Sequence, residues 1–300
     1  MKSLNYSDVK IKADLTIEIG NKNFDEFLSF EKGLVVGSSI FLTGTSGAGK
    51  TTLAITLQRS LSEYRTALYS REMSASRVKT QMKQYPVEHK NAYIADKEMC
   101  PTLEAFIKEL DEMRPKVVIV DSLQVIMRED YADVSANVSG FNIIQMLRAW
   151  TEKNDAVLIV VGHVNKDGEF EGKNIIEHMF DSHMEMIFDK KRNTRTLSWA
   201  KNRNGSVEKS LFYEFGEKSI EFYTPEQYET VKNGKKLEDY LLEMIKTFLS
   251  SLDTNNPNYE LFAEEIGLEM SKIYDSSEDL LDVHLKFVHK IKSLLKKYQF

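Results

Sequence analysis

Cysteine is nearly absent from this sequence, which contains only Cys100. A single cysteine excludes an intramolecular disulfide and a cysteine-rich zinc site, and His163, His178 and His183 lack the spacing of zinc ligands. No apolar run approaches the roughly 18 residues of a membrane-spanning helix, and the first residues lack the apolar run of a secretory signal. We therefore expect a cytoplasmic protein without a membrane partner.

Positive charge is not in excess either, since 46 acidic residues outnumber 40 basic ones and give a formal net charge of −6. This balance neither predicts nor excludes a nucleic-acid partner, because a ring-shaped protein can keep its basic residues in a channel while its outside stays acidic. Of the 300 residues, 42% are apolar. That is enough to bury the core of one α/β domain and to leave an appendage.

The most informative stretch that is present, Gly44–Thr51, matches the phosphate-binding pattern G-x-x-x-x-G-K-[ST] at every fixed position. Residues 39–43 before it are typical of a buried strand, and residues 51–61 after it are typical of a helix. An ordinary glycine-rich turn is the alternative, but the order strand, loop and helix favours a nucleotide site. The expected nucleotide-binding residues are Gly44, Thr45, Ser46, Gly47, Ala48, Gly49, Lys50, Thr51 and Thr52.

Strand and helix signals alternate through the first part of the chain. Helices are expected to open at Thr102 and to cover residues 137–153. The candidate strands are 39–43, 67–70, 116–121 and 156–161. Strands that alternate with helices predict right-handed crossovers and a mostly parallel sheet covered on both faces, with the site at the carboxyl ends of the strands.

Beyond residue 181 the connections become shorter. Residues 183–188, 194–203 and 208–215 are typical of strands, and Asn204-Gly205 between the last two is a hairpin turn signal.

From about Pro225 the strand signals end, and we expect a second, helical part of the chain. This division predicts an ATPase domain over residues 1–223, with its core at about 24–215, and a C-terminal helical module over 224–300. Its stretch Val283–Phe300 holds five lysines and no acid beside apolar residues at helical spacing, which favours a packing helix over a DNA-binding one. Helices are expected near 237–252, 259–274 and 277–297.

Candidate catalytic side chains follow the predicted strand ends. Asp121 ends an apolar run, the form expected when a central strand delivers a carboxylate to Mg²⁺, although such aspartates also cap helices. Glu72 can orient a water for attack on a γ-phosphate or can be a first-turn acid of a helix. His163 is either a γ-phosphate sensor or a structural histidine.

Two cations lie near the predicted hairpin tip. Strand alternation sends Lys201 and Arg203 to the same face. Such a pair can supply positive charge to the nucleotide of a neighbouring subunit, or it can be an exposed basic turn. The residues by themselves favour the basic turn.

Taken together, these stretches resemble the RecA-fold ATPases, and most closely the ATPase core of the RadA/Sms branch-migration proteins. The resemblance covers roughly residues 24–215. Its most specific part resembles that family's glycine-histidine-valine-x-lysine loop and its leucine-glutamate-histidine-methionine continuation. Helicases of the DnaB type share two of the stretches but not that loop. The matching stretches are 33–38 leading into the glycine loop, 120–124, 161–168 with 177–181, and 201–205, and the stretches shared with the DnaB-type helicases are 69–74 and 201–205.

The resemblance implies a RecA-like P-loop fold that uses ATP and Mg²⁺. It places Lys50 at the phosphates, Thr51 and Asp121 at the metal, Glu72 as the catalytic base and His163 as the sensor.

The resemblance also implies an assembly that holds DNA. Lys201 and Arg203 would then act catalytically across a subunit interface, and residues 126–140 and 164–180 would line a channel for single-stranded DNA. The expected DNA-phosphate contacts are Lys166 and Lys173.

The sequence departs from the RadA/Sms pattern in three ways. It contains neither the four-cysteine zinc module with which those proteins usually begin nor the Lon-protease-like domain with which they usually end. Asn204 stands where that family's lysine-asparagine-arginine-phenylalanine-glycine motif has phenylalanine.

The function expected from residues and resemblance together is that of an ATP hydrolase stimulated by DNA. It would form a homo-oligomer, a hexameric ring, that moves on single-stranded DNA as a helicase-like motor in recombination, repair or replication. The alternative is a nucleotide-switched regulatory assembly resembling KaiC-like proteins, in which the helical module 224–300 recruits a protein partner. A P-loop kinase is disfavoured by the strand-end acid, the sensor loop and the cationic hairpin.

Overall fold

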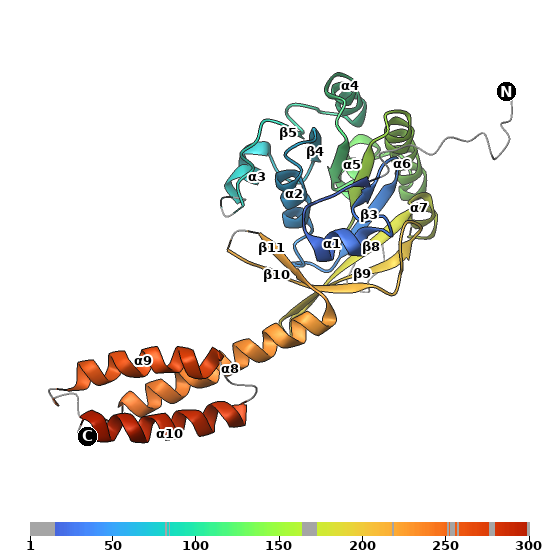
Figure 1. The fold of residues 1–300 in the computed structure, drawn as a ribbon. Helices are drawn as coiled ribbons and strands as arrows, with labels where there is room; N and C mark the ends of the chain where they lie inside the picture. Colours follow the sequence, from blue (N-terminus) through green and yellow to red (C-terminus); the bar gives the residue numbers. More distant parts are fainter. Residues whose placement is uncertain are drawn as a thin grey trace. The chain divides into compact units, whose positions relative to one another are not determined.

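The structure is a computed structural model. The chain forms two compact units, Met1–Pro225 and Glu226–Phe300, and Figure 1 labels most of their elements. The structure describes residues 16–81, 83, 85–163, 173–217, 219–250, 252, 256, 258–275 and 280–298.

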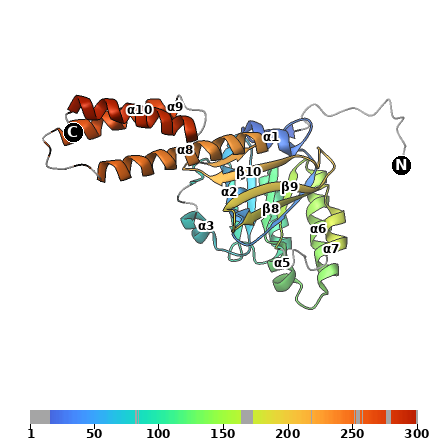
Figure 2. The same cartoon turned by 90° about the horizontal axis from the view of Figure 1, so that it is seen from below.

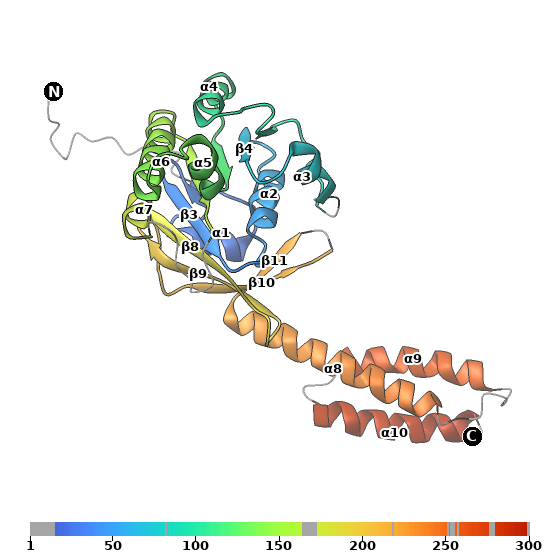
Figure 3. The same cartoon turned by 180° about the vertical axis from the view of Figure 1, so that it is seen from behind.

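The first unit is built on a nine-stranded sheet in the order β11-β10-β9-β8-β3-β7-β6-β4-β5. The six strands from β8 to β5 are parallel, and β9, β10 and β11 extend the sheet in antiparallel fashion, as Figure 3 shows from behind. A separate pair joins β1 (Thr16–Ile17) to β2 (Leu34–Val35). The large sheet consists of β3 (Ser39–Gly44), β4 (Thr66–Ser70), β5 (Ala92–Asp96), β6 (Val117–Asp121), β7 (Val157–Val161), β8 (Ser182–Asp189), β9 (Thr194–Asn202), β10 (Ser210–Phe215) and β11 (Ile220–Tyr223).

Seven helices of the described residues lie on the two faces of this sheet, and Figure 2 shows α1 to α3 on one side and α5 to α7 on the other. Along β6, Val117 and Ile119 belong to the same buried cluster as residues of α1 and α2, whereas Val118 and Val120 belong to the cluster that contains residues of α4, α5 and α6. A strand buried on both faces must be apolar at every position, which explains its continuous apolar run. The helices are α1 (Lys22–Leu28), α2 (Lys50–Ser60), α3 (Ala75–Gln81), α4 (Leu103–Met113), α5 (Leu123–Asp130), α6 (Ala136–Lys153) and α7 (Lys173–Met179).

This architecture confirms the predicted α/β fold with a mostly parallel sheet. The elements α1, α5, α7, β5 and β11 were not predicted from the sequence.

The connection between β9 and β10 differs from the predicted hairpin. The two strands do pair in antiparallel fashion, but Ser198 lies opposite Ser210, so residues 203–209 form a longer loop than the turn expected at Asn204-Gly205. The loop is shaped by distant contacts, since the Phe30 N–H donates to the Asn204 carbonyl over 3.0 Å. An Asn-Gly signal is local, and here tertiary contacts override it.

The second unit consists of helices that share one apolar core. The unit contains α9 (Tyr259–Asp275), α10 (Leu280–Tyr298) and most of α8 (Pro225–Ser250). Two of the α10 lysines pair with α9 acids, Lys290 with Glu269 at 2.7 Å and Lys297 with Glu265 at 2.5 Å, and the helix packs through its apolar face. The buried core residues are Phe262, Ile266, Met270, Ile273, Val283, Phe287, Ile291 and Leu294.

None of the helices in the described part of the chain is both long enough and apolar enough to cross a bilayer.

Candidate active site

The glycine loop between β3 and α2 has a backbone that only glycine can adopt without strain. Gly47 and Gly49 have φ angles of 80° and 97°, in the left-handed region that other residues avoid. A Cβ on Gly49 would lie 2.3 Å from the Phe215 ring, and a Cβ on Gly44 would lie 2.0 Å from the Met186 carbonyl oxygen. Glycine is therefore required both for the turn and for close packing against β8 and β10.

The first residue of α2, Lys50, directs its ammonium group back over this loop. Its Nζ donates to the Gly44 carbonyl at 2.8 Å and to the Thr45 carbonyl at 3.3 Å. Burial lowers the pKa of Lys50, while the nearby Asp121 and Glu72 carboxylates oppose that shift. The ammonium group thus lies within the loop where a phosphate would be bound.

Thr51 and Asp121 form the part of the site that suits a divalent cation. Thr51 donates its hydroxyl to Asp121 Oδ2 over 2.7 Å. The Asp121 side chain is buried, which raises its pKa, and its Oδ1 has no hydrogen-bond partner among the described residues. Buried polar atoms are normally satisfied, so an unpartnered carboxylate oxygen beside a threonine hydroxyl fits Mg²⁺ or its water shell.

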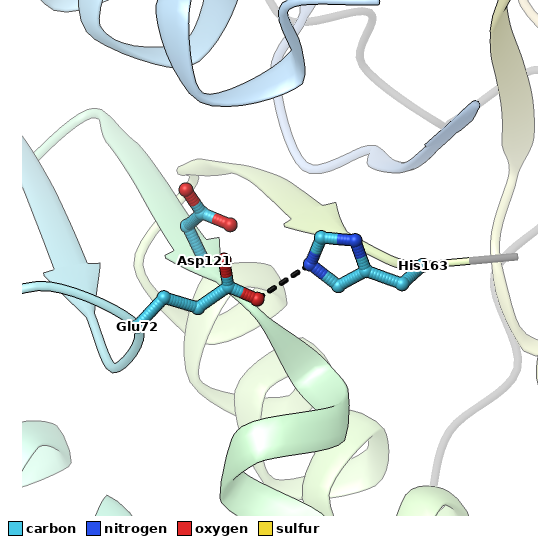
Figure 4. Close-up of side chains that lie close together, drawn as sticks. All are labelled: Glu72, Asp121 and His163. Atoms are coloured by element: carbon cyan, nitrogen blue, oxygen red, sulfur yellow. Dashed lines mark hydrogen bonds and ion pairs between the residues drawn. The ribbon is translucent and has the colours of Figure 1, made fainter. Parts of the chain in front are cut away.

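Glu72 and His163 meet beside Asp121, although they follow different strands (Figure 4). His163 Nε2 lies 2.5 Å from Glu72 Oε1, and Ser122 donates its hydroxyl to the same oxygen over 2.7 Å. Possible ligand atoms of Glu72, Asp121 and His163 all lie within 4.8 Å of one another.

The charge state of Glu72 follows from these contacts. The hydrogen bond with His163 is the largest cause that lowers the pKa of Glu72 to about 2, against the opposing effect of burial. The carboxylate is therefore ionised at neutral pH. It also precedes α3, which begins at Ala75, so it lies in the loop after β4.

Lys201 and Arg203 are not part of this cluster. Lys201 donates to the Phe180 carbonyl at 2.5 Å, and Arg203 Nη1 lies 3.6 Å from Asp181 Oδ1. Lys201 lies opposite His183, at the level of Phe41 on β3. Three further residues, about 10 Å at 3.3 Å each, separate that level from Gly44, so the two cations lie toward the other edge of the sheet.

The DNA-contact predictions are only partly within the described residues. Lys166 lies outside them, and Lys173 is the first residue of α7, with a side chain that is not described. The other expected loop, residues 126–140, is mostly helical, because α5 ends at Asp130 and α6 begins at Ala136, and it carries Arg128 as its one basic residue. Its acids Glu129 and Asp130 pair with the buried Arg71 at 2.7 and 2.8 Å.

Sequence reasoning missed the residues that support the glycine loop from β8, β9 and β10. Arg195 stacks its guanidinium on the Phe188 ring, 4.0 Å from the centroid, and lies 5.1 Å from that of Phe215. Tyr213 donates its hydroxyl to the Ala48 carbonyl over 2.7 Å. These residues follow the loop by more than 130 positions, and only the strand pairing brings them to it.

The sheet order, the glycine loop and the acids at the strand ends define a P-loop ATPase of the RecA fold. Residues 29–169 match a family described as an AAA domain. A solved structure of a KaiC-like protein from Pyrococcus horikoshii has the same fold, with a TM-score of 0.57 and 19% identity, covering 69% of this chain and 98% of that one.

Proteins of similar sequence relate the chain to a DNA repair protein. DNA repair protein RadA of Streptococcus pneumoniae is 29% identical over 184 residues, which is 61% of this chain and 43% of that protein. RadA of Salmonella typhimurium is 29% identical over 203 residues, or 67% of this chain and 43% of that protein. The chain is thus a RecA-fold ATPase related to RadA, as the resemblance predicted, and it spans less than half the length of these relatives.

Proposed function

We propose that this chain is a Mg²⁺- and ATP-dependent hydrolase that single-stranded DNA stimulates and that acts as a motor in recombination, repair or replication. The observation that carries the hydrolase part is the convergence of Glu72, Asp121 and His163 within 4.8 Å of one another beside Thr51 and the glycine loop. The relation to DNA repair protein RadA supports the DNA part.

In this proposal the glycine loop N–H groups and Lys50 bind the triphosphate. Thr51 and Asp121 would hold Mg²⁺, which supplies charge neutralisation to the phosphate oxygens when bound. Glu72 orients the attacking water and accepts its proton, because its carboxylate is ionised and is fixed by Ser122. His163 contacts the same oxygen of that carboxylate as Ser122 does and senses whether a γ-phosphate is present.

The same proposal assigns Lys201 and Arg203 to the nucleotide of a neighbouring subunit. Both lie about 10 Å or more along the sheet from their own glycine loop, so their positive charge can serve phosphoryl transfer only in trans. A homo-oligomeric ring, for which we propose six subunits, satisfies this requirement. Activity would then depend on assembly.

The remaining assignments follow from the relation to RadA and from the sequence. We propose that Lys166 and Lys173 contact single-stranded DNA in the channel of the ring. The ATPase domain would cover residues 1–223, and the helical module 224–300 would bind a protein partner in the cytoplasm.

The test is ATP hydrolysis with and without single-stranded DNA, with Lys50→Ala as the control for contaminating activity. Strong stimulation that Lys50→Ala abolishes is the expected result. Turnover that depends on Lys50 but not on DNA would refute the motor and direct the search to a protein bound by the helical module. Fluorescence anisotropy with labelled DNA separates a binding defect from a coupling defect.

A further inference from the structure

The corner between α7 and β8 contacts both cations that the proposed function assigns to the neighbouring subunit. The Phe180 carbonyl accepts the Lys201 ammonium group at 2.5 Å. The next residue, Asp181, lies 3.6 Å from Arg203 through its Oδ1 and accepts the Arg203 N–H at its carbonyl over 3.2 Å. Two consecutive residues therefore fix where both cations project.

Asp181 is itself fixed to the first residue of β3. Its Oδ2 accepts the Ser39 N–H at 2.9 Å and the Ser39 hydroxyl at 2.8 Å, and its own N–H donates to the Ser39 carbonyl over 3.1 Å. The Asp181 side chain is 19% exposed. One carboxylate oxygen thus binds the strand that leads to the glycine loop, and the other faces the cations.

The charges around this corner show why an anion is needed there. Besides Arg203, Arg148 of α6 has its Nη2 4.0 Å from Asp181 Oδ1, and it also donates to the Met179 carbonyl. Burial first and then Arg203 lower the pKa of Lys201, Arg148 adds to the decrease, and Asp181 and Glu177 oppose it. Like charges at such distances repel, and a nearby carboxylate offsets that repulsion.

We propose that Asp181 is a positioning residue that holds Lys201 and Arg203 in place for the nucleotide of a neighbouring subunit. The inference rests on the proposed function, in which these two cations act in trans. Asp181 binds Ser39 at the amino end of β3, whereas the glycine loop follows the carboxyl end of that strand. Asp181 therefore does not contact the glycine loop of its own subunit. Its loss should therefore slow hydrolysis at the neighbour's site and leave its own site competent.

The first experiment measures steady-state ATP hydrolysis by Asp181→Asn. This variant keeps the size of the side chain and an oxygen that can accept from Ser39, but it removes the charge that faces Arg203. Losing the ion pairs with the exposed Arg203 at 3.6 Å and with Arg148 at 4.0 Å predicts a kcat about 5- to 10-fold lower, with an unchanged KM for ATP. Ser39→Ala is the matched control, because it removes the two hydrogen bonds between the Ser39 hydroxyl and Asp181 but none of the Asp181 charge, and it should stay within about threefold of the parent.

The second experiment mixes subunits and separates positioning from folding. Lys50→Ala subunits cannot hydrolyse ATP, but they carry intact Asp181, Lys201 and Arg203. Mixed with Asp181→Asn subunits, they should restore hydrolysis at the Asp181→Asn sites that they adjoin. A general folding defect in Asp181→Asn would impair its own site and prevent this recovery.

A parallel mixture distinguishes the two proposals. Lys201→Ala/Arg203→Ala subunits mixed with Lys50→Ala subunits should also recover, and failure there would overturn action in trans and the role of Asp181 with it. If that mixture recovers, two results would overturn only the positioning role of Asp181. One is a parent-like rate of Asp181→Asn by itself, and the other is no recovery of the mixture that contains Asp181→Asn.

Discussion

Two groups of charged residues lie toward opposite ends of β3. Toward its carboxyl end, Glu72, Asp121 and His163 come from the ends of β4, β6 and β7 and contact one another or Thr51. Toward its amino end, Lys201 of β9 and Arg203, which follows that strand, lie at the corner formed by Phe180 and Asp181. In the proposed function the first group holds the metal and orients water, whereas the cations of the second group supply positive charge. The comparison teaches that the proposed chemistry and the proposed supply of extra charge lie at different ends of the same strand.

The largest expected effect falls on the first group. Glu72→Gln keeps the size of the side chain but removes the proton acceptor, so kcat should fall by up to about 10⁴-fold. ATP affinity should persist, because Lys50 and the glycine loop are unchanged. Steady-state hydrolysis and binding of a fluorescent ATP analogue check this, with the exposed Glu98→Gln as control. A parent-like rate would remove Glu72 from the mechanism.

The second group should give a somewhat smaller effect. Lys201→Ala/Arg203→Ala should lower kcat by about 10³-fold, because positive charge supplied in trans contributes that much to phosphoryl transfer. Assembly, measured by analytical ultracentrifugation, should stay normal. Lys108→Ala/Lys153→Ala removes the same charge from exposed helix positions and should change little. Normal assembly with normal hydrolysis would show that the cations at this end are not catalytic.

The free energy of unfolding tests how closely the glycine loop packs at the carboxyl end of β3. Gly49→Ala meets both an unfavourable φ of 97° and the Phe215 ring at 2.3 Å, so it should cost about 2–5 kcal/mol in the free energy of unfolding. Gly37→Ala has an unfavourable φ of 80° but nothing within 4 Å, and should cost about 1–2 kcal/mol. Chemical denaturation of both variants checks the difference. Equal losses would contradict the close packing of β10 on the loop.

The smallest effect is expected at Ser122, whose neutral hydroxyl donates a hydrogen bond to the Glu72 carboxylate. Ser122→Ala removes one hydrogen bond to Glu72 Oε1 and leaves the His163 contact in place. The kcat should fall by about tenfold or less, with an unchanged melting temperature showing that the fold is retained. A loss as large as that of Glu72→Gln would mean that Ser122 takes part directly.

The strand-end acids show how far the sequence could predict the site. Asp121 closes a continuous apolar run and Glu72 follows another, and parallel strands end at the same edge of a sheet. Their proximity could be inferred from the order of elements. The direct contact between Glu72 and His163 could not, because it depends on side-chain orientations in two loops that lie 91 residues apart.

The β9–β10 region shows why other features escaped prediction. Alternation predicted that Lys201 and Arg203 share a strand face, but β9 ends at Asn202, and an irregularity in its pairing with β8 lies between His183 and Met184. A shift of pairing by one residue changes the face of every side chain beyond it. Where these cations lie is therefore decided by register, which local sequence does not specify.

The sequence by itself determined the glycine loop, the alternation of strands and helices, and the relation to RadA. These features depend on short-range spacing, because glycine, lysine and threonine must follow one strand directly to bind phosphate. Only the tertiary structure decided that Phe215 closes on Gly49 and that Asp181 joins Ser39 to Arg203. Such contacts join segments that are far apart in the chain, and their geometry is set by how the strands pair and how the side chains between them pack.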